Sequence, residues 1–425
     1  MKILIVVSNF PHPGHPYSGS FNKQSVVALN EFCEKIEVLA PRPYVPPFFS
    51  FFPRWEAYKQ IERYSMLNDI AIYRPAYLQV PRFFPDVWLD RGAFLCCRNQ
   101  VRVMHKQIGF DAILSFDLVA AGGLAWRLGK DLGIPAAGWA TGDDMRHPSG
   151  SPLQKVVVRA LQQLNKVFYQ SRELLEISAS LLSQPSDLIF KDKHVVLARG
   201  VPDPPNISIQ KTRDLVRSAL GIKKDHIVVM NIGRIVREKG IGEILEAASQ
   251  TTSQHPNIVY VLVGSHPAFD QTTEIQNKIN EIPYLKNKII ILPACGPGKV
   301  WELLSAADIF LFPSYQEGMP NSLLEAMAMG VPSIAFGIPP ILEIDGGKQN
   351  LLVTPPFQIR ELAEAILKLA HSPEERKIIG ERGREAVRAR FSIKKNMLEA
   401  VRVLGLVHRY WPQTSKRKIK ILPGL

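Results

Sequence analysis

Residues Ile227–Ile241 read IVVMNIGRIVREKGI, an apolar run that ends in glycine and passes through a basic loop into a helical pattern. A buried strand, a tight loop and a helix in this order form the βα unit of a doubly wound sheet. Ligands of such sheets bind outside the carboxyl ends of the strands. The stretch therefore predicts an α/β fold that places Arg234 and Lys239 at a ligand-binding edge.

Arg234 and Lys239 supply a guanidinium and an ammonium to one edge of the predicted sheet. Two cations aimed at one diphosphate neutralise it without a metal, and they stabilise the charge that develops when a nucleoside diphosphate leaves. A solvated basic loop is the more common origin of such residues. This cluster alone therefore leaves both interpretations open.

A second cluster, residues Glu317–Gly330, reads EGMPNSLLEAMAMG. Asn321 or Ser322 is a suitable helix N-cap, and strong helix formers follow until a glycine ends the helix. Glu317 then lies in the preceding loop, and Glu325 lies inside the first turns of the helix.

The start of this predicted helix offers a place for the phosphates of a nucleotide sugar. Free N–H groups and partial positive charge put the amides of Asn321, Ser322 and Leu323 in position to bind a phosphate oxygen. Glu317 is then placed to accept sugar hydroxyls, and Glu325 to accept ribose hydroxyls. A solvent-facing acidic pair on an amphipathic helix is the alternative that the spacing alone leaves open.

Together the two clusters resemble the donor-binding domain of the retaining glycosyltransferases of family 4, which have the GT-B fold. The resemblance runs through most of residues 225–390. It rests on the Gly-Arg and Lys-Gly pairs at 233–240, on the Glu-x7-Glu element at 317–325, and on the segment 345–353. It implies that the arginine and the lysine hold the donor diphosphate, that the first glutamate lies by the sugar, and that the second lies by the ribose.

The amino-terminal half matches the family less closely. Residues Met1–Val7 read MKILIVV, which is too short a run for a signal peptide, and we expect a first parallel strand there. The loop that follows, before a helical stretch at 24–32, resembles the glycine loop of the family, which approaches the donor phosphates across the cleft. Gly19 is the candidate residue, because only a residue without a Cβ lets the backbone come close.

The acceptor side departs from the family pattern. Residues Asp111–Asp117 stand where many relatives have a strand that ends in His-x-His, and Leu114 and Phe116 occupy the histidine positions. Asp117 is the titratable residue left at that strand end. Asp144 ends the next strand and turn, which resemble a Gly-x-Asp element of the family.

The resemblance thus implies a site of three parts. The expected catalytic residues are Arg234, Lys239 and Glu317. The expected donor-binding residues are Gly19, Gly233, Gly318, Met319, Pro320, Asn321, Ser322, Leu323 and Glu325, and the acceptor candidates are Asp117 and Asp144. We expect no cofactor beyond the nucleoside-diphosphate sugar, which is a co-substrate. We also expect no metal, because hard cations need several converging oxygens and the chain contains no Asp-x-Asp.

Composition and charge narrow the class of protein. The 425 residues are 46% hydrophobic, typical of a globular chain of two domains, and no apolar run reaches the roughly 18 residues of a membrane span. Four cysteines give neither a disulfide framework nor a zinc spacing, so we expect a reduced, cytosolic compartment.

The net charge of +13 points to an anionic partner. Residues 402–425 hold six Lys and Arg and no acid, and the segments 44–55 and 77–88 are rich in aromatic residues and proline. These features suit peripheral contact with an anionic membrane at the inner face of the plasma membrane. The two aromatic segments are equally compatible with loops packed on the domain's own core. No nucleic-acid motif is present, so we expect no such partner.

The expected fold is α/β of the GT-B type, with two Rossmann-like doubly wound domains and the donor/acceptor cleft between them. Prolines near 202–205 predict a hinge at 201–212. Residues 1–200 then form the acceptor-side domain, and residues 213–390 form the donor-binding domain. A C-terminal helix within 391–425 is expected to cross back onto the first domain.

The expected activity is that of a retaining, metal-independent glycosyltransferase that moves a sugar from a nucleoside diphosphate to a hydroxyl of a glycan or lipid-linked saccharide. We expect a role in polysaccharide or cell-envelope biosynthesis. Two alternatives stay open: a sugar-nucleotide epimerase of similar fold, and a non-catalytic nucleotide-sugar-binding subunit of a polysaccharide assembly complex.

Overall fold

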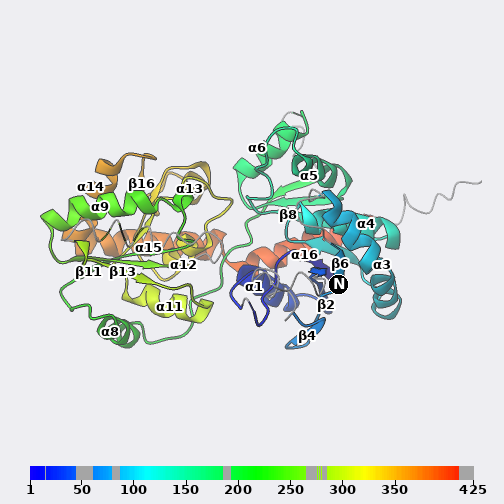
Figure 1. Ribbon diagram of the computed structural model, residues 1–425, viewed down its shortest axis with the longest axis horizontal. Coiled ribbons are helices and arrows are strands. Elements are labelled where there is room, and N and C mark those ends of the chain that lie inside the picture. Colours follow the sequence, from blue (N-terminus) through cyan, green and yellow to red (C-terminus); the bar gives the residue numbers. More distant parts are fainter. Residues whose placement is uncertain are drawn as a thin grey trace, which may run out of the picture. The chain divides into compact units, whose positions relative to one another are not determined.

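A computed structural model of the protein divides the chain into two compact units (Figure 1). Unit 1 contains Met1–Arg199 and Lys394–Leu425, and unit 2 contains Gly200–Ile393. The structure describes residues 1–14, 16–44, 61–78, 87–184, 193–264, 275, 277, 279 and 285–410. Most of the two aromatic segments and the end of the basic tail therefore lie outside the described residues.

Among its described residues, unit 1 forms an eight-stranded sheet of order β10-β9-β8-β7-β1-β2-β5-β4, in which the β4–β5 pair is antiparallel and the other pairs are parallel. A second, two-stranded sheet pairs β3 with β6. The strands are β1 (Lys2–Val6), β2 (Lys35–Leu39), β3 (Arg42–Tyr44), β4 (Tyr64–Leu67), β5 (Ile70–Tyr73), β6 (Ala76–Leu78), β7 (Ala112–Ser115), β8 (Ala136–Ala140), β9 (Lys166–Tyr169) and β10 (His194–Val196).

Helices cover the larger sheet of unit 1 and bring in the end of the described chain. They are α1 (Ser20–Asn30), α3 (Val87–Ile108), α4 (Ala120–Leu132), α5 (Pro152–Gln163), α6 (Arg172–Leu181) and α16 (Ile393–Tyr410). In Figure 1 the orange-red α16 lies among the blue and cyan elements of unit 1. Nδ1 of its His408 lies 3.0 Å from the carbonyl oxygen of Asp111, and its Lys394 pairs with Glu31 at 3.0 Å. The helix thus packs on unit 1.

Unit 2 forms a parallel sheet of order β13-β12-β11-β14-β15-β16. The strands are β11 (Ile227–Ile232), β12 (Ile258–Val263), β13 (Ile289–Leu292), β14 (Ile309–Phe312), β15 (Ser333–Phe336) and β16 (Leu352–Thr354). The helices are α8 (Ile209–Ala219), the short 3-10 helix η2 (Arg237–Lys239), α9 (Ile241–Gln254), α11 (Pro297–Ala306), α12 (Asn321–Ala328), α13 (Pro339–Asp345), α14 (Ile359–His371) and α15 (Pro373–Arg390).

The strand sequences explain why the central strands of the two large sheets are parallel and lie between helices. Strands β8 (AAGWA) and β12 (IVYVLV) are buried at every position, and β1 (KILIV) is buried at all but the first. Strands covered by helices on both faces are continuously apolar instead of alternating. Trp139 of β8 is fully buried, and its ring centroid lies 4.8 Å from that of Phe168. Each unit therefore has its own apolar core.

Both sheets share one topological feature. In unit 1 the first strand, β1, lies between β2 and β7, and in unit 2 the first strand, β11, lies between β12 and β14. The chain therefore builds each sheet outward in two directions from its first strand. The carboxyl ends of β1 and β7, and those of β11 and β14, flank the switch points at which such sheets bind ligands.

The two passages of the chain between the units lie side by side. Val201 and Ser392 form an isolated parallel bridge. The amide of Val201 donates to Phe391 O at 2.9 Å, and the amide of Ile393 donates to Val201 O at 3.0 Å. Gly200, with φ +80°, allows this approach, since a Cβ there would lie 2.4 Å from Phe391 O. Backbone hydrogen bonds therefore hold the two connecting segments together at the start and the end of unit 2.

Candidate functional site

Unit 2 brings the two predicted clusters together through their loops. Helix η2 ends at Gly240, whose φ is +71°, and a Cβ there would lie 2.0 Å from the carbonyl oxygen of Pro313. The carbonyl oxygen of Glu238 accepts a hydrogen bond from the amide of Tyr315 at 3.0 Å. The loops after β11 and β14 are thus fixed against each other by backbone contacts, and this close approach requires a glycine.

This contact places Lys239 against Glu317. The Nζ of Lys239 lies 2.5 Å from the Oε1 of Glu317, and the two side chains are only 14% and 11% exposed. A charge-assisted hydrogen bond shielded from water is stronger and better oriented than a surface pair. Two of the three residues predicted to be catalytic are therefore in direct contact.

Arg234, the third predicted catalytic residue, lies exposed in the loop that follows β11. A Cβ on the preceding Gly233 would meet nothing within 4 Å. The opposite side of this loop is closely packed, because a Cβ on Gly264 would lie 1.7 Å from the carbonyl oxygen of Gly233. The space on the Cα side of Gly233 is therefore open, and the exposed Arg234 is the next residue.

Helix α12 begins after the buried turn Gly318–Pro320. The N-cap is Pro320, with φ −82° and ψ 97° and no side-chain capping bond, so the prediction that Asn321 or Ser322 caps the helix is wrong. The amide of Leu324 donates to Pro320 O at 3.1 Å. The amides of residues 321–323 precede this bond and so have no acceptor within the helix.

Glu325 lies partly buried in α12. Burial raises the pKa of its carboxyl group to about 7. No charged partner contributes to this shift. The group is therefore balanced between its acid and its carboxylate near neutral pH, and a ligand that donates hydrogen bonds to it favours the carboxylate.

In unit 1, Gly19 serves the packing of its own loop. It has φ +70°, and a Cβ there would lie 2.6 Å from the carbonyl oxygen of Asn9. The same oxygen accepts a hydrogen bond from Nδ2 of Asn22 at 2.7 Å. As the N-cap, Gly19 starts α1 at Ser20, which is earlier than the helical stretch expected at 24–32.

Asp117 and Asp144 lie at the carboxyl ends of neighbouring strands and hold backbone together. Oδ1 of Asp117 accepts hydrogen bonds from the first two amides of α4, each at 3.0 Å. Asp144 is 7% exposed and accepts from the amides of Leu118, Thr141 and Gly142 at 2.8–3.0 Å. Burial, and next the charge of Asp117, raise the pKa of Asp144 to about 6, while the three amides lower it. The carboxyl of Asp144 is thus occupied by backbone groups.

A buried arginine that we did not predict lies near these two carboxylates. Arg199 is 4% exposed, and its Nη1 donates to Oδ1 of Asn22 at 2.6 Å. Its guanidinium lies 5.1 Å from the ring centroid of Phe116. Burial lowers the pKa of Arg199 to about 10, and the charges of Asp144 and Asp117 oppose that shift. Phe116, at a histidine position of the family pattern, therefore packs on a cation instead.

Comparisons with known proteins identify the domain in unit 2 and a relative that matches most of the chain. Residues 212–386 match the sequence model of the family described as Glycosyl transferases group 1. Over 400 residues the chain is 27% identical to TuaC of Bacillus subtilis, which is assigned to teichuronic acid biosynthesis as a glycosyltransferase; the match covers 93% of this chain and 96% of TuaC. Unit 2 thus contains a domain of the group 1 glycosyltransferase family, and the protein is a glycosyltransferase.

Solved structures confirm the predicted fold class of this glycosyltransferase. Sucrose-phosphate synthase from Thermosynechococcus elongatus is similar with a TM-score of 0.74 at 18% identity, over 96% of this chain and all of that one. HepE from Anabaena, in complex with UDP-glucose, is similar with a TM-score of 0.69 at 16% identity, over 95% of this chain and all of that one. The glycosyltransferase has the GT-B fold, with two Rossmann-like units.

The predicted donor residues of the glycosyltransferase lie in unit 2 with one exception, Gly19, which lies in unit 1 together with Asp117 and Asp144. The prediction missed the structural role of Gly240, although a glycine directly after Lys239 was a usable sign of a left-handed turn. It also missed Arg199, since nothing in the sequence pairs this residue with positions more than eighty residues away. Within the described residues, no group of three or more His, Cys, Asp or Glu side chains is arranged to hold a metal ion.

Proposed function

We propose that this glycosyltransferase moves a sugar from a nucleoside diphosphate to a hydroxyl of a glycan or lipid-linked saccharide, with retention of configuration and without a metal, as the family 4 resemblance implies. The observation that carries the proposal is the Lys239–Glu317 pair at the switch point of unit 2, beside the start of α12. A cation, a carboxylate and a helix N-terminus on one sheet edge complement a diphosphate that carries a sugar.

Each donor residue then has a distinct part. Arg234 and Lys239 neutralise the diphosphate, and the amides at the start of α12 bind its oxygens. Glu317 accepts hydrogen bonds from sugar hydroxyls, while its contact with Lys239 keeps the ammonium turned toward the leaving group. Glu325 accepts the ribose hydroxyls. The crystal structure of HepE with UDP-glucose supports a donor of this class.

The transfer step breaks the bond between the anomeric carbon and the diphosphate oxygen. The acceptor oxygen forms the new bond on the same face, and its proton passes to the departing diphosphate. Two cations and a helix N-terminus stabilise the negative charge that grows on the diphosphate, and this is where most of the rate enhancement arises.

On the acceptor side, Asp117 orients the hydroxyl that is glycosylated. Asp144 positions the strand ends, since backbone amides occupy its carboxyl group. The similarity to TuaC, which is assigned to teichuronic acid biosynthesis, supports a role in the biosynthesis of an envelope polysaccharide.

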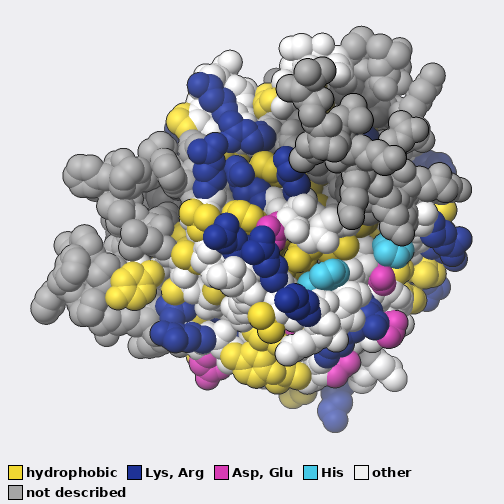
Figure 2. Space-filling view, turned by 90° about the vertical axis from the view of Figure 1, so that its right-hand side faces the viewer, with side chains coloured by type: hydrophobic (Ala, Val, Ile, Leu, Met, Phe, Trp, Pro, Cys, Tyr) yellow, Lys and Arg dark blue, Asp and Glu magenta, His cyan; other side chains and the backbone are white. Residues whose placement is uncertain are grey.

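The acceptor is reached at the inner face of the plasma membrane. Helices α3, α4 and α5 contain eight Lys and Arg residues but only two Asp, and we call this surface the basic face. The apolar side chains of Leu95 and Val103 are 60% and 54% exposed on it. Figure 2 shows Lys and Arg side chains gathered on one face of the molecule, where acidic side chains are sparse. Such a surface suits anionic lipid headgroups.

Within the residues that the structure describes, no helix combines the length and the apolar character needed to cross a bilayer. Attachment through the basic face predicts that the protein sediments with vesicles that contain anionic lipid and stays in solution with neutral vesicles. Sedimentation that is the same with both kinds of vesicle would overturn the membrane part of the proposal.

The test of the enzymatic proposal begins with donor binding, measured as thermal stabilisation by a panel of nucleoside diphosphates and their sugars. Sugar transfer from the donor that binds is then assayed with the membrane fraction as the source of acceptor. Lys239→Ala should lower turnover at least a hundredfold, since it removes a cation that stabilises the leaving diphosphate. Lys368→Ala is the matched control, because Lys368 forms an exposed pair with Glu375 at 2.9 Å.

Two results would replace the proposal. Release of an altered sugar nucleotide without any acceptor would identify an epimerase. Donor binding without consumption in the presence of the membrane fraction would identify a nucleotide-sugar-binding subunit whose partner carries out the chemistry. Near-normal turnover of Lys239→Ala would remove the catalytic role given to this lysine.

A further inference from the structure

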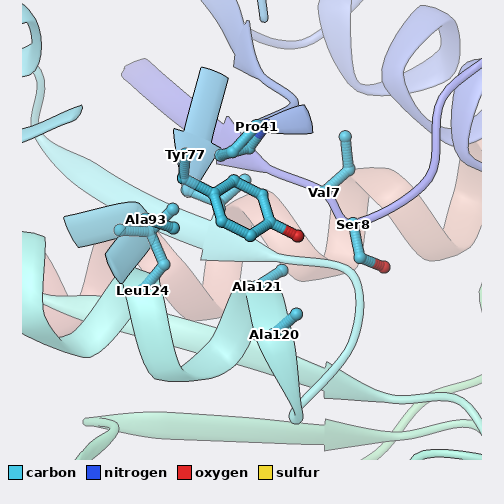
Figure 3. Close-up of a pocket in the computed structure, with 9 residues that line it drawn as sticks. Val7, Ser8, Pro41, Tyr77, Ala93, Ala120, Ala121 and Leu124 are labelled. Atoms are coloured by element: carbon cyan, nitrogen blue, oxygen red, sulfur yellow. The ribbon is translucent and has the colours of Figure 1, made fainter. Parts of the chain in front are cut away.

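Unit 1 contains a cavity of about 40 Å³ at the carboxyl end of β1 (Figure 3). Its walls come from five parts of the chain that are far apart in sequence. The residues used below are Val7, Ser8, Tyr77, Ala93, Ala120 and Ala121.

The position of the cavity is that of a ligand site. Val7 and Ser8 follow β1, and Ala120 and Ala121 begin the helix that follows β7. Strands β1 and β7 are neighbours, and the chain builds the sheet in opposite directions from them. The cavity therefore lies at the switch point of unit 1, the place at which open α/β sheets bind their ligands.

The chemistry of the walls selects an uncharged group. No lining residue carries a charge, and Ala93 and Ala121 are 5% and 2% exposed. In Figure 3 the hydroxyl end of Tyr77 points toward Ser8, so the polar side-chain atoms gather at one side. An ion placed here would lose its hydration without gaining a partner, whereas a methyl group would leave water favourably.

The size of the cavity sets the size of the group. Its 40 Å³ exceeds the roughly 15 Å³ that a cavity needs to hold one water molecule, and it is far below the roughly 150 Å³ of a cavity that binds benzene. The space accepts a methyl group and excludes a sugar ring.

The cavity shares two lining residues with the hydrogen bonds of the carboxylate assigned to the acceptor. Oδ1 of Asp117 accepts hydrogen bonds from the amides of Ala120 and Ala121, whose side chains line the cavity. A group held in the cavity therefore lies within one helical turn of the carboxylate that orients the acceptor hydroxyl.

We propose that the cavity binds the acetamido group of an N-acetylated acceptor sugar, with the methyl group inside and the carbonyl oxygen toward the hydroxyl of Ser8. This rests on the proposed function, because it names the class of acceptor for the same site. The acetamido group matches the cavity in two respects. Its methyl group has the right size for the cavity, and its polar carbonyl oxygen faces the exposed rim at Ser8.

The first experiment measures binding alone. The ¹⁹F line width of N-trifluoroacetylglucosamine is recorded with wild-type protein and with Ala121→Val or Ala93→Val, which fill the cavity from two different helices. The control is Ala125→Val, one turn further along α4, because Ala125 is fully buried and does not line the cavity. Thermal unfolding of each variant identifies those that fold, and two filling variants from separate helices keep the test usable if one does not.

We expect the signal to broaden with wild type and Ala125→Val and to stay sharp with the filling variants. Broadening that is equal in all folded variants, or absent from wild type, would overturn the proposal.

The second experiment compares acceptors. Wild type should prefer the p-nitrophenyl glycoside of N-acetylglucosamine over that of glucose by about fourfold or more in kcat/KM, the gain expected for moving one methyl group out of water. The N-butanoyl analogue should lose this preference, as should Ala121→Val. If a 6-deoxy sugar is a better acceptor than the N-acetylated sugar, the methyl group in the cavity is that of the deoxy sugar. This result would overturn the acetamido assignment.

The failures of the two proposals are distinguishable. If broadening depends on Ala121 but no donor is consumed, the acetamido site stands and the enzymatic proposal fails. If donor is consumed and transferred with no dependence on the cavity, the enzymatic proposal stands and the acetamido site fails.

Discussion

The switch points of the two units have the same topology and opposite chemistry. In unit 2 the loops after β11 and β14 meet through Gly240 and place a lysine and a glutamate in contact. In unit 1 the end of β1 and the start of α4 line a small uncharged cavity, and the nearby carboxylates of Asp117 and Asp144 accept hydrogen bonds from backbone amides.

Under the functions proposed above, the doubly wound sheet fixes where a ligand binds and the loops decide what binds. The same placement beside a first strand serves a diphosphate in one unit and a neutral group in the other under the functions proposed above. Function on a common fold thus resides in a few loop residues. We therefore expect the loss of a charged side chain to lower activity more in unit 2 than in unit 1.

The largest effect is expected at Glu317. Glu317→Gln should lower turnover at least a hundredfold, because it leaves the largely buried Lys239 without its charged partner and removes an acceptor for the sugar. Turnover is measured with saturating donor. Glu364→Gln, from an exposed ion pair with Arg360, is the control. Equal activity of the two variants would show that the pair is structural only.

The next largest effect concerns the contact between the loops of unit 2. Gly240→Ala should lower the free energy of unfolding by about 2 kcal/mol, because it forces a left-handed residue against a backbone oxygen. Gly233→Ala meets open space and should change stability little. Chemical denaturation of both variants gives the comparison. Equal midpoints would contradict the account of how the two loops are joined.

A smaller effect is expected from the corresponding carboxylate of unit 1. Asp117→Asn keeps an oxygen that accepts the amides at the start of α4, so the fold should persist. The acceptor KM should rise about tenfold, with donor binding unchanged, since one charge-assisted hydrogen bond to the acceptor is lost. If Asp117→Asn lowers turnover as much as Glu317→Gln does, the proposed difference in chemistry between the two units is wrong.

The smallest effect is a pH dependence caused by Glu325. Its pKa of about 7 lies above the ordinary value of 4.5, so the folded protein keeps a proton that the unfolded chain has lost. Its contribution to stability is therefore present below pH 4.5 and is lost as the pH rises toward 7. Glu325→Gln should raise the melting temperature relative to wild type more at pH 8 than at pH 5.

The same titration affects donor binding. Ribose hydroxyls favour the carboxylate, so the donor diphosphate should bind severalfold more tightly as the pH rises from 6 to 8, and Glu325→Gln should flatten that profile. Calorimetry at several pH values measures it. A profile that is unchanged in the variant would place the titrating group elsewhere.

The sequence predicted unit 2 better than unit 1 for a physical reason. The continuous apolar strands and the helix formers after Pro320 are local signals, and they located β11, β14 and α12. The start of α12 was displaced because Asn321 is a good N-cap in general, whereas here the preceding proline already has the extended backbone of an N-cap.

Unit 1 depends on contacts between residues that are distant in the chain, and these leave no local signal. The partners of Arg199 come from α1 and from the end of β7, and the cavity draws on β1, β6, α3 and α4. Gly19 was recognised as a special backbone position, but its nearest neighbour is Asn9. A single sequence shows that such a glycine is needed without showing what it lies against.

The paired passages between the units make a natural site for recombination. Because Val201 and Ser392 are bridged to each other, an exchange of Gly200–Ile393 between two group 1 glycosyltransferases would carry both sides of that bridge together. Only two junctions would need to be made, and they would be adjacent in space. Each unit also keeps its own apolar core, so chimeras built at these junctions offer a route to new pairings of donor and acceptor.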